Sequence, residues 1–148
     1  MEAKAKIEYF CVYQERCHSE VTKKLYEWGL ATDQVDVLIS DLIQNNFLNE
    51  GRFAEAYVSG KFRIKRWGRN KIRVHLKQKH VNEYSIKKAL DSIDEETYIE
   101  TIELLAQKKQ AEVNGNQWEK RRKCYSYLLN KGFESSLIQN VLDKLFPL

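Results

Sequence analysis

Three segments of the chain carry the same apolar pattern at a nearly constant spacing, and this internal repeat limits what the chain can fold into. The anchors Leu25, Leu76 and Leu128 lie 51 and 52 residues apart. A fixed period combined with apolar spacing of three and four indicates stacked helical units. After the anchors, apolar residues match in four sets: Val35, Ile86 and Ile138; Leu38, Ala89 and Val141; Ile39, Leu90 and Leu142; Leu42, Ile93 and Leu145.

Helices are predicted along nearly the whole chain. Apolar side chains recur at three and four positions, as in the segment from Val35 to Leu42, and the single proline is Pro147. Gly29 and Gly132 each follow a helical pattern, where the left-handed residue that ends a helix is expected. Each repeat therefore contains a helix, a tight turn with an apolar residue just after it, and a second helix.

The predicted fold is all-α, with three tandem three-helix repeats that contain helix-turn-helix-like units. A third helix is expected before the second and third of these units, at about residues 49–63 and 95–110. Repeats of this kind lean on their neighbours, so we expect an elongated, curved array. Within a single chain of residues 1–148, the repeats are placed at about residues 7–46, 47–94 and 95–148.

Positive charge is concentrated in one part of the chain. The formal net charge is +4, yet residues 61–90 alone hold 11 basic residues and 1 acidic residue. Within them, the segment KFRIKRWGRNKIRVHLKQKH (Lys61–His80) carries nine lysines or arginines and no acid. A field of this density favours an anionic partner, either nucleic acid or an acidic protein surface.

This basic segment is predicted to form an organised contact surface. At roughly 100° per residue, a helix through it brings the following residues to one face: Arg66, Arg69, Arg73, Lys77 and His80. The alternative is an ordinary solvated helix face. The candidate contact residues are Arg63, Arg66, Arg69, Lys71, Arg73, Lys77 and Lys79. The sequence alone does not decide whether they contact DNA phosphates or acidic side chains.

A second basic cluster opens a helix of the third repeat and consists of Lys120, Arg121, Arg122 and Lys123. Positive charge is unfavourable at a helix N-terminus. The cluster therefore indicates either a bound external anion or long side chains that extend along the surface.

Recognition of specific bases is not expected. A tryptophan can stack on a base, but we expect Trp28, Trp67 and Trp118 to pack on neighbouring helices. Helix-turn-helix readers of the major groove place Arg, Asn or Gln near the start of the second helix. Here the second helices begin TDQVDV, NEYSIKK and ESSLIQN, of which the first is acidic and the third nearly neutral.

The sequence offers no motif for catalysis, a cofactor or a metal. His18, His75 and His80 lack metal-binding spacing, and neither a phosphate-binding loop nor a nucleophile motif occurs. The three cysteines form no CxxC pair, which favours reduced thiols in a cytoplasmic protein. No apolar run approaches the ~18 residues of a membrane span. We therefore expect a non-enzymatic protein with no cofactor and no membrane partner.

Four segments, taken in order, resemble the RecX family of bacterial regulators of the RecA recombinase. RCHSEVTKKLYEWG (residues 16–29) is similar to the opening motif of that family, and NFLNEGRFAEAY (residues 46–57) to its G-Y-L-(D/N)-(D/E)-x-x-F-A-x-x-Y signature. RIKRWGRNKIRVHLKQK (residues 63–79) and LLNKGF (residues 128–133) are similar to its basic-glycine-helix segment and its closing repeat. The resemblance covers roughly residues 7–146. Asn46 and His80 depart from it, because the family usually has glycine there.

The resemblance implies a protein that binds the RecA–DNA filament and modulates, most often inhibits, ATP hydrolysis and strand exchange by RecA. It thereby implies a part in DNA repair, recombination and the SOS response. The implied partners are the RecA nucleoprotein filament and single- or double-stranded DNA, and we expect a monomer. The residues themselves also allow a general nucleic-acid-binding helical repeat that needs no RecA, and a scaffold for another acidic protein.

Overall fold

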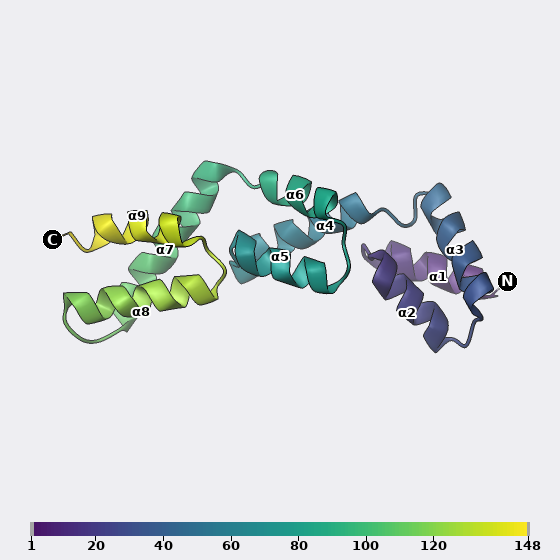
Figure 1. Ribbon diagram of the computed structural model, residues 1–148, viewed down its shortest axis with the longest axis horizontal. Coiled ribbons are helices and arrows are strands. Elements are labelled where there is room, and N and C mark those ends of the chain that lie inside the picture. Colours follow the sequence, from purple (N-terminus) through teal and green to yellow (C-terminus); the bar gives the residue numbers. More distant parts are fainter. Residues whose placement is uncertain (1, 148) are drawn as a thin grey trace. The chain divides into compact units, whose positions relative to one another are not determined.

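The computed structural model describes residues 2–147, which form helices joined by short turns (Figure 1). No strand occurs in this part of the chain, and the all-α prediction is confirmed. The helices are α1 (Glu2–Tyr13), α2 (His18–Glu27), α3 (Thr32–Gln44), α4 (Glu50–Gly60), the π-helical turn η1 (Lys61–Lys65), α5 (Arg69–Gln78), α6 (Glu83–Asp91), α7 (Glu95–Glu112), α8 (Gln117–Asn130) and α9 (Ser135–Leu145).

These helices belong to two compact units. Unit 1 comprises the described residues up to Val58 together with His75–Ala89. Unit 2 comprises Ser59–Val74 and the described residues from Leu90 onward. The basic segment of the sequence therefore contributes residues to both units.

Each unit has its own apolar core. In unit 1, α2 packs against α1 and α3, and the cluster between them consists of Ile7, Cys11, Val21, Leu25, Val35, Leu42 and Leu48. In unit 2, α7, α8 and α9 pack on one another, and the fully buried side chains include Tyr98, Ile102, Leu128, Phe133 and Ile138. The amphipathic spacing read from the sequence is what supplies these inward faces.

The predicted repeat is visible in the backbone of three equivalent turns. After α2, α5 and α8, the chain takes a left-handed conformation at Gly29 (φ 85°), His80 (φ 61°) and Gly132 (φ 98°). The next amide then donates to the carbonyl of the anchor leucine five residues earlier, as in a Schellman turn. These bonds are Leu30 to Leu25 at 3.3 Å, Val81 to Leu76 at 3.2 Å and Phe133 to Leu128 at 3.2 Å.

The two departures from family glycines fall at left-handed backbone positions. His80 has φ 61° and Asn46 has φ 62°. Histidine and asparagine are among the non-glycine residues that adopt this region most often. The turns therefore keep their geometry without glycine, at a cost in conformational strain.

The helices expected before the second and third helix-turn-helix units are present. The helix predicted at 49–63 is α4 followed by η1, and the helix predicted at 95–110 is α7, which extends to Glu112. The basic segment consists of η1, a turn at Arg66–Gly68 and helix α5, followed by Lys79 and His80. The helix expected through Arg66 and His80 is therefore shorter than predicted at both ends.

Candidate basic interface

Helix α5 carries only part of the predicted basic face. Arg66 adopts a left-handed conformation (φ 58°) before the helix, and His80 lies beyond its end. The expectation that both share the helical face is therefore wrong. Arg69, Arg73 and Lys77, spaced by four along α5, do keep a common face.

The break before α5 is caused by a contact between two turns. The Gly68 amide donates to the Lys131 carbonyl at 2.7 Å, and the Asn70 amide donates to the Gly132 carbonyl at 2.9 Å. A Cβ on Gly68 would overlap the backbone of Gly132 and Phe133. Gly68 is thus required by a close approach of two backbones. Partners more than sixty residues away in the sequence fix where α5 begins.

Arg69 is held inside unit 2 by two carboxylates. Its guanidinium lies 2.7 Å from Oε2 of Glu95 and 2.9 Å from Oε2 of Glu134. It also lies 3.8 Å from the centre of the Tyr98 ring. Burial on its own would lower the pKa of Arg69, but the hydrogen bonds to the two glutamates outweigh it and raise that pKa. Arg69 therefore ties α5 to α7 and to the start of α9.

Tyr98 completes the same network. Its buried hydroxyl donates to Oε1 of Glu134 and accepts the Arg69 amide at 3.0 Å. Its ring packs between Phe62 and Phe133, with ring centroids 5.7 and 5.4 Å away. Burial, and then the hydrogen bond to Glu134, raise the pKa of Tyr98. These contacts use Arg69 for structure, which leaves it a poor donor to an external anion.

In unit 1, Lys77 and Lys79 also have acidic neighbours. Nζ of Lys79 lies 3.2 Å from Oε2 of Glu20, and the Lys79 carbonyl accepts the Ser19 hydroxyl at 2.7 Å. Lys77 lies 3.7 Å from Glu83 in an exposed pair, where ion pairs contribute little. Lys79 therefore anchors the end of α5 to α2, while Lys77 stays on the surface.

Four cations gather around one surface pocket of unit 2, here called the Lys131 pocket. It has a volume of about 760 Å³ and is lined by Ile64, Lys65, Arg66, Leu104, Leu105, Gln107, Lys108 and Lys131. No carboxylate is among the lining residues. Of the apolar residues, Ile64 is 79% exposed. The pocket therefore combines uncompensated positive charge with exposed apolar surface.

The cations of the Lys131 pocket repel one another. Nζ of Lys131 donates to the Lys65 carbonyl at 2.7 Å, which holds the ammonium near the other cations. Burial lowers the pKa of Lys131, and the charges of Lys71, Arg66 and Lys65 lower it further. A bound anion would relieve this repulsion, so the arrangement suits phosphate or carboxylate.

The remaining predicted residues lie in different surroundings. Arg63 is exposed on η1, and Arg73 lies on α5 one turn after Arg69. Lys71 lies 4.6 Å from the centre of the Trp67 ring, and Lys61 lies 4.9 Å from it. Trp67 is half-buried near these two cations, and the expectation that it packs on a neighbouring helix stays a prediction.

The other two tryptophans differ in how far they are buried. Trp28 packs against the core of unit 1 as expected. Trp118 is 69% exposed, so the expectation that it packs on a neighbouring helix is wrong. It lies in the first turn of α8, and the guanidinium carbon of Arg122 is 5.4 Å from its ring centre.

The second basic cluster is largely used within unit 2. Arg121 pairs with Asp143 at 2.9 Å, and Lys123 donates to the Asn114 carbonyl at 2.9 Å. The helix begins at Gln117, before the cluster, and Asn116 and Glu119 form a capping box there. Because the cap satisfies the helix start, the N-terminal position no longer indicates an external anion.

Three of the four cations of the Lys131 pocket were not among the predicted contacts. Lys65 belongs to the basic segment but was not chosen from it. Lys131 precedes Gly132 in the third repeated turn, and the docking of that turn on Gly68 brings it to Arg66. Lys108 stands on α7, whose first half is acidic, and no sequence signal pointed to it. Among the described residues, no cluster of His, Cys, Asp or Glu could hold a metal ion.

Two further properties of the described residues bear on the sequence expectations. Cys11, Cys17 and Cys124 are buried free thiols, and burial raises the pKa of each. Within residues 2–147, none of the helices has the length and apolar character that crossing a bilayer requires.

Comparison with known proteins identifies the family. The family description "RecX, second three-helix domain" matches residues 49–90, and "RecX, third three-helix domain" matches residues 96–142. Regulatory protein RecX of Chlorobium phaeobacteroides (strain BS1) is 32% identical over 134 residues, which cover 89% of this chain and 87% of that protein. Regulatory protein RecX of Clostridium tetani (strain Massachusetts / E88) is 30% identical over 129 residues, but this chain spans only 59% of it.

Solved structures agree with this result. A crystal structure of a regulatory protein RecX superposes with a TM-score of 0.87 at 27% identity, covering 96% of this chain and 70% of that one. The crystal structure of RecX from Lactobacillus salivarius gives a TM-score of 0.89 at 24% identity, covering 97% and 94% of the two chains, which shows the shared fold. The chain belongs to the RecX family of regulatory proteins.

Proposed function

We propose that this protein regulates a RecA recombinase by binding the RecA–DNA filament and lowering its ATP hydrolysis and strand exchange. Its effect on DNA repair and recombination would follow from that binding. The proposal rests on membership of a family whose relatives are named regulatory protein RecX. The protein would act as a monomer in the cytoplasm, by occupancy of the filament, with no reaction of its own.

The observation that carries the proposal is the Lys131 pocket. Lys65, Arg66 and Lys108 line it without a carboxylate beside them, and Lys131 is held among them by the Lys65 carbonyl. Of the residues expected from the sequence, Arg66 contributes to this pocket directly and Lys71 acts on the pKa of Lys131. Arg69 and Lys79 are engaged by glutamates, so we assign them to the support of the fold.

A strand-exchange assay with matched variants tests the proposal. The pocket variant carries Lys65→Glu, Arg66→Glu and Lys108→Glu, which reverse three cations of the Lys131 pocket. The control variant carries Lys23→Glu, Lys88→Glu and Lys144→Glu, three exposed lysines elsewhere. Both variants change the net charge equally. We expect inhibition by the wild type and the control variant, and its loss in the pocket variant. Equal inhibition by all three proteins would refute the role of the pocket.

General nucleic-acid binding without RecA is the second candidate, because a pocket without carboxylates also suits phosphate. It predicts that DNA affinity in the absence of RecA falls steeply with salt. The plot of log affinity against log salt has a negative slope. If all three reversed cations contact phosphates, this slope is shallower by about 2 to 3 in the pocket variant. A wild-type protein that binds DNA this way but leaves RecA unaffected supports the second candidate and contradicts the first.

A further inference from the structure

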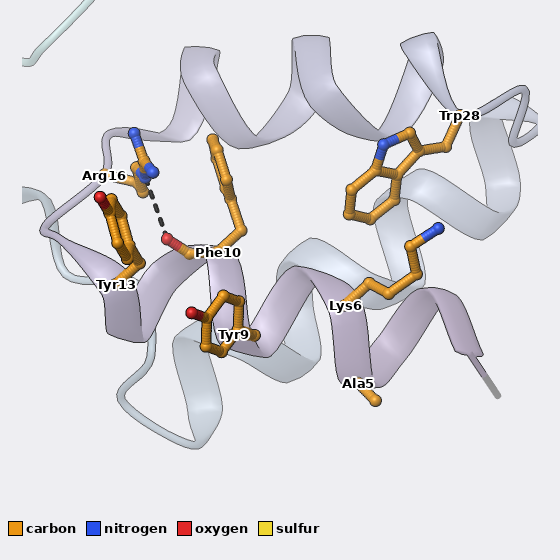
Figure 2. A pocket seen from close by; sticks show the side chains of 7 residues that line it. All are labelled: Ala5, Lys6, Tyr9, Phe10, Tyr13, Arg16 and Trp28. Carbon is orange, nitrogen blue, oxygen red and sulfur yellow. Dashed lines mark hydrogen bonds between the residues drawn. The ribbon is translucent and has the colours of Figure 1, made fainter.

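Unit 1 carries a pocket that the basic interface does not include, here called the aromatic pocket (Figure 2). It has a volume of about 530 Å³ and lies where side chains of α1 meet those at the two ends of α2. Its walls are largely apolar, because four aromatic rings supply most of the surface. The lining residues are Ala5, Lys6, Tyr9, Phe10, Tyr13, Arg16 and Trp28.

Helix α1 exposes more apolar surface than its packing needs. Its inner face buries Ile7 and Cys11 in the core of unit 1. On its outer side, Tyr9 is 69% exposed and Tyr13, one turn later, is 70% exposed, with ring centroids 6.3 Å apart. A helix that packs on one side only is normally polar on the other. An exposed apolar face beside a pocket is typical of a site for a partner.

Cations lie at both ends of the aromatic pocket. Nζ of Lys6 lies 4.9 Å from the centre of the Trp28 ring, and the Arg16 guanidinium carbon lies 3.7 Å from the centre of the Phe10 ring. Nε of Arg16 donates to the Phe10 carbonyl at 3.0 Å, which fixes that guanidinium in place. Figure 2 shows Lys6 beside Trp28 and Arg16 beside Tyr13 and Phe10. No acidic side chain lines the pocket.

We propose that the aromatic pocket binds a short amphipathic helix of a protein partner, with two apolar side chains one turn apart and a carboxylate beyond each. The α1 wall from Ala5 to Tyr13 rises about 12 Å at ~1.5 Å per residue, or roughly two helical turns. That length accommodates anchors at i and i+4 of a docked helix. The cations at the two ends, Lys6 and Arg16, meet the two carboxylates, and the tyrosines cover the anchors.

A single-stranded nucleic acid fits the same pocket less well. Stacking on the rings would be favourable, but such a strand also needs a basic groove along its phosphates. Only two cations, Lys6 and Arg16, line the aromatic pocket, so a strand laid across the rings would find no basic groove for its other phosphates. A helix with one carboxylate at each flank needs only these two cations. The site therefore favours a protein segment.

Fluorescence anisotropy with defined probes tests this inference, independently of RecA. The probe is a labelled, stapled helical peptide with two leucines one turn apart and a glutamate beyond each. The matched peptide has lysines in place of the glutamates. The protein is tested as the wild type, with Tyr9→Ala and Tyr13→Ala together, and with Tyr84→Ala, which removes an equally exposed tyrosine of unit 1. The tyrosines are exposed, so these variants keep the fold.

We expect the glutamate peptide to bind the wild type and the Tyr84→Ala variant alike. Binding should weaken roughly tenfold or more in the double tyrosine variant, as for the loss of anchoring aromatic contacts. The lysine peptide should bind at least about tenfold more weakly than the glutamate peptide. The proposal is overturned if neither peptide binds, if both bind equally, or if the tyrosines do not matter. It is also overturned if Tyr9 and Tyr13 are instead needed for binding oligodeoxythymidine or for self-association in sedimentation.

Discussion

Substitution of Gly68 by alanine tests the contact between the two turns that sets the start of α5. A Cβ at this position would overlap the carbonyl carbon and oxygen of Gly132 and the amide nitrogen of Phe133. All three are backbone atoms, so no side-chain rotation can relieve the overlap, and the two turns must separate. Separation stretches the hydrogen bonds from Gly68 to Lys131 (2.7 Å) and from Asn70 to Gly132 (2.9 Å).

The size of the effect follows from these contacts. Overpacking of a tight contact costs about 1–3 kcal/mol, and each of two weakened hydrogen bonds contributes up to about 1 kcal/mol. We therefore expect Gly68→Ala to lower the free energy of unfolding by about 1–5 kcal/mol. Urea denaturation followed by far-UV circular dichroism measures this difference.

Gly60→Ala is the matched control. Gly60 has an ordinary right-handed helical backbone (φ −65°), and no atom lies within 4 Å of the position of its added Cβ. Alanine there should raise the free energy of unfolding by about 0.5–1 kcal/mol, because glycine loses more backbone freedom on folding. If the two variants have the same free energy of unfolding, the two turns are not in close contact at Gly68.

Three further predictions follow from single residues. Tyr98→Phe removes the hydroxyl bonded to Glu134 and the Arg69 amide, and should cost about 1–3 kcal/mol in urea unfolding; an unchanged midpoint would argue against the network. His80→Gly relieves a left-handed conformation and should add about 0.5–1 kcal/mol, whereas a loss would contradict the turn geometry. Because burial raises the pKa of Tyr98 above its ordinary value of 10.0, the folded state holds that proton more tightly than the unfolded state. Stability should therefore be intact below pH ~10 and fall above it, less steeply in Tyr98→Phe than in the wild type.

The repeated turns were predictable because each depends on neighbours in the sequence. Each turn is defined by six consecutive residues. They begin with the anchor leucine, end with the apolar residue five positions later, and include the left-handed residue. Glycine at positions 29 and 132 indicates a left-handed turn by residue type alone. His80 could be matched to these two positions only by aligning the three repeats. A periodic pattern needs no knowledge of distant contacts, so the helices and their inward faces followed from it.

The basic interface was less predictable because distant partners decide it. Arg69 pairs with Glu134, 65 positions away, and Lys79 pairs with Glu20, 59 positions away. A helical wheel predicts that both cations face solvent and are available to a partner. In the fold, both instead form ion pairs with glutamates of other helices or turns. Lys131 joins Arg66 only because the Gly132 turn docks on Gly68.

The tryptophans show the same limit at a single residue. Trp28 packs on the core of unit 1, whereas Trp118 is exposed. Trp28 follows the pattern of α2, while Trp118 stands in the first turn of α8. Residue type alone therefore could not separate the two.

Regulation of RecA through the Lys131 pocket is tested by DNA-dependent ATP hydrolysis, measured as this protein is titrated into RecA. We expect the wild type to lower the rate to a plateau, and Lys65→Glu, Arg66→Glu and Lys108→Glu together to shift the titration to at least about tenfold higher concentration. The Lys23→Glu, Lys88→Glu and Lys144→Glu variant should follow the wild type. An unchanged rate at saturating wild-type protein would show that this protein does not regulate RecA. Identical curves for the wild type and the pocket variant would show that the Lys131 pocket does not contact the filament.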